Sequence, residues 1–376
     1  MEIAIVGGGI GGLAVAAGLH KIGIKTHVYE QAHAFKPLGA GIGIGSNVMV
    51  ALEALGVSEE IKSRGMTLKE QRFLNGDFKV MNRIDFSLLK KRFGEENITI
   101  QRADLHHALF EAVDPAYVHF GKKVANFQQT QDNVTLAFID GTEAVADYVI
   151  AADGIHSVFR EALVNSSLPR YTGYTCWRGV SSSQQDVPAH ISSEAWSRRG
   201  RFGWAPLYNG DVYWFACVNA EADDTYYQGL DQSGTAQLFA HFPPIVKRLI
   251  TDTDDTYFLH HDIYDIEPLS TFVYDRICLL GDAAHATSPN MGQGAGQSIE
   301  DAYVLMDALQ HEQSVREAFD RYDAQRVWKT GKVVKLSRQI GSAAQWDNPF
   351  LVAFRNGVFP LIPKSLLFWR LTFLFK

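Results

Sequence analysis

The first thirty residues alternate between apolar runs and one glycine-rich segment. Residues 3–6 form a short β-branched run of the kind that builds a buried parallel strand. Residues 13–22 are rich in alanine and leucine and predict a helix, and residues 25–29 predict a second strand that ends at Glu30. With the glycine-rich segment, residues 7–12, between strand and helix, this order predicts a βαβ unit.

The glycine spacing in this unit is typical of a dinucleotide-binding turn. Gly7 would make the tight turn, Gly9 would let the backbone approach a pyrophosphate, and Gly12 would let the helix pack closely on the strand. Glu30 would bind ribose hydroxyls, which fits NAD or the ADP half of FAD and disfavours a 2′-phosphate. A glycine-rich turn without a ligand is the alternative.

Further apolar runs predict two more strands that end in an acid and a glycine. Residues 148–152 lead into Asp153, and residues 276–280 lead into Gly281 and Asp282, with a helix expected over 297–309. Residues 37–45 carry glycine at every second position from Gly39, so their backbone could lie against a flat ligand, unless the segment is simply a flexible loop.

The middle of the chain changes to a pattern of strands rich in aromatic residues. Strands are predicted over 174–181, 193–198, 202–208 and 212–219, the last two as a hairpin, followed by helix over 232–250 and a strand over 257–263. An aromatic-rich sheet suits a pocket for a flat substrate, although we expect half or more of these side chains to be core. They are Trp177, Trp196, Trp204, Tyr208, Tyr213, Trp214 and Phe215.

Composition narrows the class of protein. The 376 residues predict about two domains, and 46% hydrophobic with 20% charged residues excludes disorder. The net charge of −7 makes nucleic acid an improbable partner. Three cysteines far apart indicate neither a disulfide scaffold nor a zinc site, so we expect a cytoplasmic protein. The adjacent pairs His106-His107 and His260-His261 would point their side chains to different sides of a helix or strand, so we expect no metal site.

The two ends of the chain need separate interpretation. The N-terminal apolar stretch has an acid in place of a basic leader and is broken by glycines, which argues against a signal peptide. The C-terminal residues 349–376 are rich in phenylalanine and leucine, but Pro360, Pro363, Lys364 and Arg370 interrupt them. Peripheral membrane contact through this tail stays open as an alternative that we do not favour.

Three motifs together resemble one family. The glycine turn at 7–12, an Asp-Gly-x-x-Ser-x-x-Arg motif at 153–160 and a Gly-Asp-Ala-Ala-His motif followed by Pro289 occur in the order found in the single-component (class A) FAD-dependent aromatic hydroxylases. This family contains 4-hydroxybenzoate, salicylate and urate hydroxylases, and tetracycline-inactivating and zeaxanthin-epoxidising monooxygenases. The similarity extends over nearly the whole chain.

The resemblance implies a cofactor, a reaction and site residues. It implies FAD as cofactor, NAD(P)H as co-substrate, and hydroxylation of a small aromatic or heteroaromatic substrate by O2 through a flavin C4a-hydroperoxide, with no catalytic triad. The cofactor-binding residues that it implies are Gly7, Gly9, Gly11, Gly12, Glu30, Gln31, Gly43, Arg102, Val124, Asp153, Asp282, Gly292, Gln293, Gly294, Ala295 and Gly296. Arg160 would act with Asp153 in linking FAD and NAD(P)H binding, whereas Ser157 could equally be a structural cap and His285 is expected to belong to the fold.

The same resemblance suggests residues of the substrate pocket. Arg178, Arg201, Tyr213 and Pro289 are the candidates, since an arginine binds a carboxylate, phenolate or urate-like anion with two hydrogen bonds. A surface position is the alternative for the arginines. Urate hydroxylases of the family carry an aspartate after the motif proline; here it is Asn290, which puts urate specificity in doubt.

We therefore predict an α/β protein: a Rossmann-like FAD-binding domain, an inserted mixed β-sheet substrate domain and a C-terminal helical tail. The expected FAD-binding domain comprises 1–68, 93–172 and 268–343, the substrate domain 69–92 and 173–267, and the tail 344–376. A disulfide reductase is excluded because a cysteine pair and a second glycine fingerprint are missing. An NAD-dependent dehydrogenase would leave the Asp153 and Asp282 motifs unexplained. A reductase, epoxidase or halogenase on the same fold, or a non-enzymatic FAD-binding protein, are the alternatives.

Overall fold

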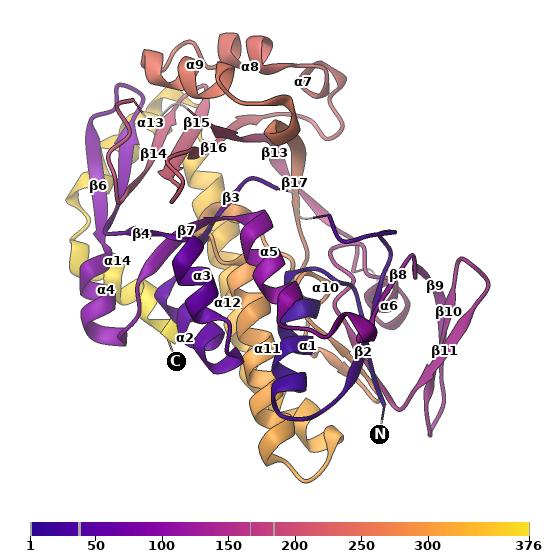
Figure 1. Ribbon diagram of the computed structural model, residues 1–376. Helices are drawn as coiled ribbons and strands as arrows, with labels where there is room; N and C mark the ends of the chain where they lie inside the picture. The colour runs from indigo at the N-terminus through magenta and orange to yellow at the C-terminus, as the bar shows by residue number, and fades with distance from the viewer. Residues whose placement is uncertain (1, 37–38, 166, 183–184, 376) are drawn as a thin grey trace.

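A six-stranded sheet forms the base of the molecule in the computed structural model, which describes residues 2–36, 39–165, 167–182 and 185–375 (Figure 1). The strand order is β18-β19-β12-β1-β2-β8, parallel except between the first two. The strands are β1 (Ile3–Val6), β2 (Thr26–Glu30), β8 (Val118–Phe120), β12 (Tyr148–Ala151), β18 (Val273–Tyr274) and β19 (Ile277–Leu279). With α1 (Ile10–Lys21) between β1 and β2, the predicted βαβ unit is confirmed.

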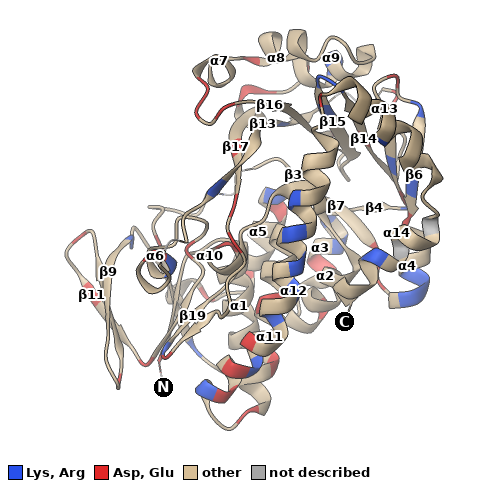
Figure 2. Cartoon of the chain, turned by 180° about the vertical axis from the view of Figure 1, so that it is seen from behind, with Lys and Arg blue, Asp and Glu red and all other residues tan. Residues whose placement is uncertain are grey.

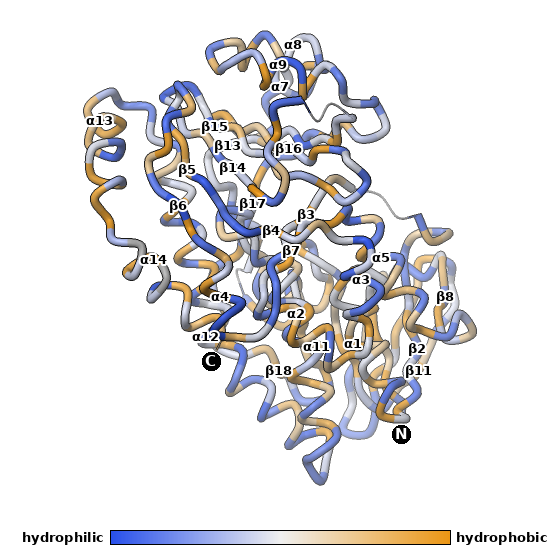
Figure 3. Tube along the Cα trace, turned by 60° about the vertical axis from the view of Figure 1, so that its left-hand side comes forward, coloured by the Kyte–Doolittle hydropathy of each residue, from blue (hydrophilic) through white to orange (hydrophobic). Residues whose placement is uncertain are grey.

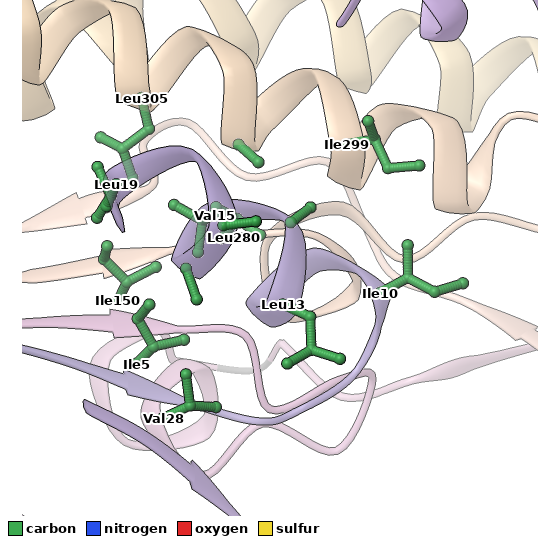
Figure 4. Close-up of a cluster of buried hydrophobic side chains, with 14 of the residues drawn as sticks. Ile5, Ile10, Leu13, Val15, Leu19, Val28, Ile150, Leu280, Ile299 and Leu305 are labelled. Atoms are coloured by element: carbon green, nitrogen blue, oxygen red, sulfur yellow. The ribbon is translucent and has the colours of Figure 1, made fainter. Parts of the chain in front are cut away.

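The main core lies between this sheet and a layer of helices. Ile5, Val28 and Ile150 from the strands lie beneath Val15 and Leu19 of α1 (Figure 4). Beside α1 runs a long helical hairpin of α11 (Gly294–His311) and α12 (Val315–Ala344) (Figure 1). The α1 helix is buried along most of its length, as its alanine-rich sequence allows.

Smaller elements surround this core. A three-stranded antiparallel sheet, β9 (Val124–Gln129), β10 (Val134–Phe138) and β11 (Glu143–Ala146), lies at the side of α6 (Val158–Leu163). A second one contains β3 (Gly41–Ile44), β7 (Asn97–Gln101) and β4 (Met66–Leu68). The remaining helices of this half are α2 (Ser46–Leu55), α3 (Ser58–Arg64), α5 (Arg102–Glu111), η1 (Pro115–Tyr117), α10 (Asp282–His285) and η3 (Pro289–Met291).

The middle of the chain forms a seven-stranded mixed sheet in the order β17-β13-β16-β15-β14-β5-β6. Its strands are β5 (Glu70–Asn75), β6 (Val80–Asp85), β13 (Arg170–Ser181), β14 (Ile191–Ser197), β15 (Gly200–Pro206), β16 (Val212–Asn219) and β17 (Leu259–Asp265). The predicted hairpin of β15 and β16 is confirmed. The helical stretch expected over 232–250 is two helices, α8 (Gln232–Leu238) and α9 (Pro244–Thr251), because Pro243 and Pro244 start a new helix instead of continuing the first.

The two faces of this sheet differ in chemistry, as the alternation of strand side chains requires. One face is apolar: Trp177, Phe202, Trp204 and Trp214 form a core with Phe239 beneath α8 and α9. The register places Arg178 and Arg201 on the opposite face, which is turned toward β3 and α12 (Figure 1). Three of the aromatic residues considered for a pocket, Trp177, Trp204 and Trp214, are therefore core.

Elements at the edge of the sheet and the C-terminal segment complete the chain. They are α4 (Phe86–Phe93), α7 (Thr225–Gln228), η2 (Asp255–Tyr257), α13 (Pro349–Val358), η4 (Phe359–Leu361), α14 (Lys364–Leu371) and η5 (Thr372–Phe375). The strand expected over 257–263 begins only at Leu259, because the Asp254 carboxylate caps η2 just before it.

A buried ion network joins the two long helices. The Arg326 guanidinium of α12 donates to Asp301 (2.6 Å) and Glu300 (2.8 Å) of α11. The second Asp301 oxygen lies 2.6 Å from Nε2 of His285 and accepts from the backbone N–H of Gly281 (3.0 Å). Because every one of these charges is buried and paired, loss of one partner leaves another uncompensated.

We expect Arg326→Leu to lower the free energy of unfolding by about 3–5 kcal/mol, since it removes the arginine partner of the buried Asp301 carboxylate and leaves Glu300 with Lys329 (2.9 Å) as its cation. Arg321→Leu is the matched control on the same helix, because Arg321 pairs with Asp307 and Glu312 at a partly exposed position and should cost no more than about 1 kcal/mol. Urea unfolding of both variants measures the difference; equal losses would contradict this account.

Candidate functional site

The turn after β1 has the geometry that the glycine spacing predicts. Gly7 has φ +106°, and a Cβ there would lie 2.3 Å from the carbonyl oxygen of Ala152; a Cβ on Gly12 would lie 1.9 Å from the carbonyl oxygen of Gly7. Gly9, the N-cap of α1, meets no atom within 4 Å of its Cβ position. Gly7 and Gly12 are therefore required by the fold itself, whereas Gly9 leaves space for a ligand at the positive end of α1.

Glu30 lies next to this turn, at the end of β2. Its carboxylate accepts the backbone N–H of Gly8 (2.6 Å) and that of Ala32 (2.8 Å). These bonds fix the carboxylate and leave each oxygen a further lone pair for a ribose hydroxyl. Gln31 is exposed beside it, whereas Val124 begins β9 with its side chain in the main core, so its backbone alone is available to a ligand.

A second glycine-rich turn leads into α11. Gly281 and Gly292 have positive φ angles of +63° and +62°, and Gly292 also has open space at its Cβ position. A Cβ on Gly11 would lie 2.9 Å from Leu280 and 3.2 Å from Ser298 of α11, so α1 and α11 approach each other closely through glycine. Gln293 is the N-cap of α11, and Gly294, Ala295 and Gly296 form its first turn. The N-terminal ends of both helices thus meet at one edge of the six-stranded sheet.

Three charged residues lie around this edge. Arg102, the first residue of α5, and Asp282, the first of α10, are both exposed. The loss of water contact around Arg102 lowers its pKa. The positive charge of Arg178 lowers this pKa further, whereas the negative charge of Asp282 raises it. Asp153 accepts the N–H of Val158 (2.9 Å) through Oδ2, while its buried Oδ1 has no hydrogen-bond partner, and burial raises its pKa.

These observations fit FAD. A pyrophosphate needs the N–H groups of a helix N-terminus approached through glycine, which Gly9 supplies, and the flat ring needs exposed backbone, which Gly43 and Gly292 supply with nothing within 4 Å of their Cβ positions. The unpartnered Asp153 oxygen and the exposed Asp282 carboxylate would accept hydrogen bonds from such a ligand. Pro37 and Leu38 of the glycine-alternating segment lie outside the described residues.

The Arg160 side chain holds backbone loops together inside the protein. It is fully buried and donates to the carbonyl oxygen of Ser167 (3.0 Å) and that of Ala283 (3.3 Å), while Ser157 caps α6 by accepting the N–H of Arg160 (3.1 Å). Arg160 therefore ties the loop after β12 to the loop after β19. His285 is also buried, in its pair with Asp301.

The polar face of the seven-stranded sheet contains the substrate-pocket candidates. Arg201 is 2% exposed; it donates to Glu194 (3.2 Å) and to Oδ1 of Asn290 (2.5 Å), and its guanidinium lies 5.0 Å from the Tyr174 ring centroid. Its Nε is buried without a partner. Arg178 is half-buried on the same face, two residues from Cys176 in the strand that pairs with β16.

The Tyr213 side chain packs against β3, the strand that contains Gly41 and Gly43. A Cβ on Gly41 would lie 2.4 Å from the Tyr213 side chain, so glycine is required there for close approach of the two segments. Burial raises the pKa of Tyr213 to about 12. Pro289 is exposed at the start of η3.

The sequence singled out Asn290 only as a departure from the urate hydroxylase pattern, and it did not reveal the contacts that Asn290, Glu194 and Tyr174 make at this face. Asn290 accepts from Arg201 and from the Tyr174 hydroxyl (3.1 Å) and donates to the carbonyl oxygen of Ser337 (2.9 Å) on α12. Glu194 pairs with Arg201 across β14 and β15. Period-two alternation places Tyr174 and Arg178 on one face, but only the strand register brings Glu194 to Arg201. Tyr174 and Asn290 also line a cavity of about 660 Å³ between the ends of β13 and β16 and α12.

Among the described residues, no group of three or more His, Cys, Asp or Glu side chains has an arrangement that could hold a metal ion.

We expect Gly9→Ala and Gly12→Ala to fail in different ways. The Gly12→Ala methyl would collide with the Gly7 backbone, so the apoprotein itself should lose several kcal/mol of unfolding free energy or fail to fold. Gly9→Ala has room in the apoprotein, so its melting temperature without ligand should stay near that of the parent protein, while the methyl group blocks FAD. Calorimetry with and without FAD separates the two; unchanged FAD affinity of Gly9→Ala would contradict the assignment.

Comparison with known proteins agrees with this geometry. A family model described as an FAD binding domain matches residues 1–337. The aurachin C monooxygenase/isomerase of Stigmatella aurantiaca is 35% identical over 93% of this chain and 91% of its own, and the 3-amino-4-hydroxybenzoate 2-monooxygenase of Streptomyces cremeus is 32% identical over 90% and 86%. The structure of Klebsiella pneumoniae HpxO with FAD and uric acid is 28% identical, with a TM-score of 0.90 over 98% of this chain and 94% of that one. The chain belongs to the FAD-dependent aromatic hydroxylases.

Proposed function

We propose that this FAD-dependent monooxygenase hydroxylates a small aromatic or heteroaromatic compound that carries a negative charge, and that Arg201 and Arg178 bind that charge. The observation that carries the proposal is the buried Arg201 guanidinium with an unpartnered Nε. Arg178 lies on the same face, and Glu194 is the carboxylate that pairs with Arg201, so positive charge exceeds negative charge here. An anionic substrate would compensate the remainder and satisfy the free N–H donor.

Asn290 is central to the choice of anion. An aspartate at this position would give Arg201 a second carboxylate partner, whereas the neutral amide oxygen of Asn290 accepts the hydrogen bond without cancelling the charge. We infer that the pocket favours a carboxylate, whose negative charge is confined to two oxygens that an arginine can bind together, over urate, whose charge is spread over its rings. The proteins named above are HpxO in a complex with uric acid, a 3-amino-4-hydroxybenzoate 2-monooxygenase and an aurachin C monooxygenase/isomerase, so the fold alone does not select the substrate.

Different groups of residues would bind different parts of FAD. Gly9, Gly11 and Gly12 with the α1 N-terminus would bind the pyrophosphate, and Glu30 the ribose. Arg102, Asp153 and Asp282 would bind polar groups along the cofactor, and the N–H groups from Gly292 to Gly296 would stabilise negative charge on the ring. When bound and reduced by NAD(P)H, FAD supplies the oxygen activation. Tyr213, which packs against Gly41 of β3, would cover one side of the bound ring and help to exclude water.

We further propose that one domain binds FAD and the other binds the substrate. Residues 1–68, 93–172 and 268–343 would hold FAD, whereas 69–92 and 173–267, which form the seven-stranded sheet and its helices, would hold the substrate. Support comes from the pairing of β5 with β14, which brings the first insertion into the same sheet as the second. The three buried free cysteines support a reducing, cytoplasmic location.

Arg201→Gln tests the proposal. We expect aromatic carboxylates that stimulate NAD(P)H oxidation in the parent protein to lose about 100-fold in kcat/KM, because removal of one partner of a buried charge contact typically costs about 2–5 kcal/mol. Neutral phenols should change much less. Arg199→Gln, an exposed arginine in the turn before β15, is the control.

Flavin absorbance shows that each variant remains folded and loaded, and mass spectrometry of the product should show one added oxygen. Equal losses for charged and neutral substrates would contradict the role of Arg201 as anion ligand, and a product without added oxygen would indicate a reductase instead.

A further inference from the structure

The C-terminal segment α13–η4–α14 exposes its apolar side. Phe350, Phe354 and Val358 recur at a spacing of four residues on α13, with Leu361 three residues later, and all four are exposed, Phe350 at 84%. Leu366 and Trp369 of α14 are exposed at a spacing of three. Helices of globular proteins normally turn such a stripe inward, so this exposed apolar stripe, residues 350–369, requires a partner other than water.

The polar side of α13 is turned inward instead. Arg355 is buried, donates to the carbonyl oxygens of Ala343 (3.1 Å) and Ala344 (2.8 Å) at the end of α12, and lies over the Trp196 ring. Phe359 stacks on Trp196 with ring centroids 5.1 Å apart, and the Asn82 side chain donates to the Phe359 carbonyl oxygen (2.9 Å). These contacts hold the helix so that its exposed apolar side chains face outward. Figure 3 shows α13 and α14, with their many hydrophobic positions, at the border of the molecule.

The charge around the stripe is positive although the chain is acidic overall. Residues 348–376 contain no acidic residue and four basic residues, of which the inward-facing Arg355 does not contribute to the outer surface; the first 347 residues contain 31 basic and 42 acidic residues. The last turn of α4 adds Lys90, Lys91 and Arg92, all exposed, of which Lys90 is paired with Glu96. Phe93 stacks on Phe375 with 3.6 Å between ring centroids, so this basic turn lies directly beside the C-terminal segment (Figure 2).

We propose that the apolar stripe and the basic residues beside it bind the surface of an anionic lipid bilayer. Aromatic and aliphatic side chains insert into the headgroup region while Lys and Arg contact lipid phosphates, which is the combination typical of interfacial helices. Among the described residues no single helix is long and apolar enough to cross a membrane; Pro349–Leu361 and Ser365–Phe375 pass that test only as a pair, bent by 96°. Two short arms at such an angle suit a segment that lies flat in the interface.

The exposed apolar stripe is connected to the proposed substrate site through a short chain of contacts. Phe359 stacks on Trp196, whose indole N–H donates to Glu194 (2.8 Å), the partner of Arg201. The docked segment would therefore lie next to the polar face of the seven-stranded sheet. Membrane binding itself does not depend on the proposed substrate and is tested without turnover.

The test is flotation of the flavin-loaded protein with vesicles of phosphatidylcholine alone or with one third phosphatidylglycerol. We expect the parent protein to float with the anionic vesicles and at least tenfold less with the neutral ones. The triple variant Phe350→Ser, Phe354→Ser, Trp369→Ser should lose at least tenfold in bound fraction, because the exposed side chains it removes are the inserting ones.

A matched triple variant on other surfaces, Leu168→Ser, Tyr208→Ser, Tyr226→Ser, removes equally exposed side chains and should bind like the parent protein. The charge variant Lys91→Glu, Arg370→Glu should weaken binding to anionic vesicles, whereas Arg198→Glu, Lys247→Glu should not.

Bound flavin confirms that every variant is folded. Absence of flotation with either vesicle, or equal flotation of the two triple variants, would overturn the proposal. A dimer in light scattering that becomes a monomer only in the tail variant, without vesicle binding, would overturn it in favour of a second copy of this chain.

Discussion

The close approach of α1 and α11 is the contact on which the rest of the structure depends. Two helices of ordinary composition are held 8–10 Å apart by their side chains, but here glycine removes the obstacle: a Cβ on Gly11 would contact Ser298, and one on Gly18 would lie 3.3 Å from Met306. The N-terminal ends of the two helices consequently lie at one edge of the parallel sheet. Both ends carry partial positive charge, which makes this edge suited to a ligand with a pyrophosphate at one end and a reducible ring at the other.

The ion network beneath these helices supports the same arrangement. Asp301 accepts the backbone N–H of Gly281 and contacts His285, so it fixes the loop that presents Asp282, while Arg326 anchors Asp301 to α12. Arg160 holds that loop from the other side through the Ala283 carbonyl oxygen. Residues of the family motifs are thus used as much to shape the backbone as to touch a ligand, which explains why a buried arginine and a buried histidine occur in them.

Local patterns predicted the local parts of this structure. The β-branched runs, the alanine-rich helix and the glycine spacing act over a few residues, and the βαβ unit, the β15–β16 hairpin and the strict need for Gly7 and Gly12 follow from them. The site at the substrate sheet depends on contacts between distant segments. Nothing near Asn290 in the sequence indicates its bond to Arg201, and the inward Arg355 and outward phenylalanines of α13 reverse the usual direction of an amphipathic helix. Such contacts depend on strand register and on packing against α12.

The most direct test of the account is a crystal structure of the protein with FAD bound. We expect the pyrophosphate within hydrogen-bond distance of the backbone N–H groups that follow Gly9, and the ring between the start of α11 and the Tyr213 side of β3, with Arg201 facing the space beside it. A pyrophosphate bound away from the α1 N-terminus, or a ring turned away from the polar face of the seven-stranded sheet, would contradict the central claim that the meeting of the two helix ends forms the cofactor site.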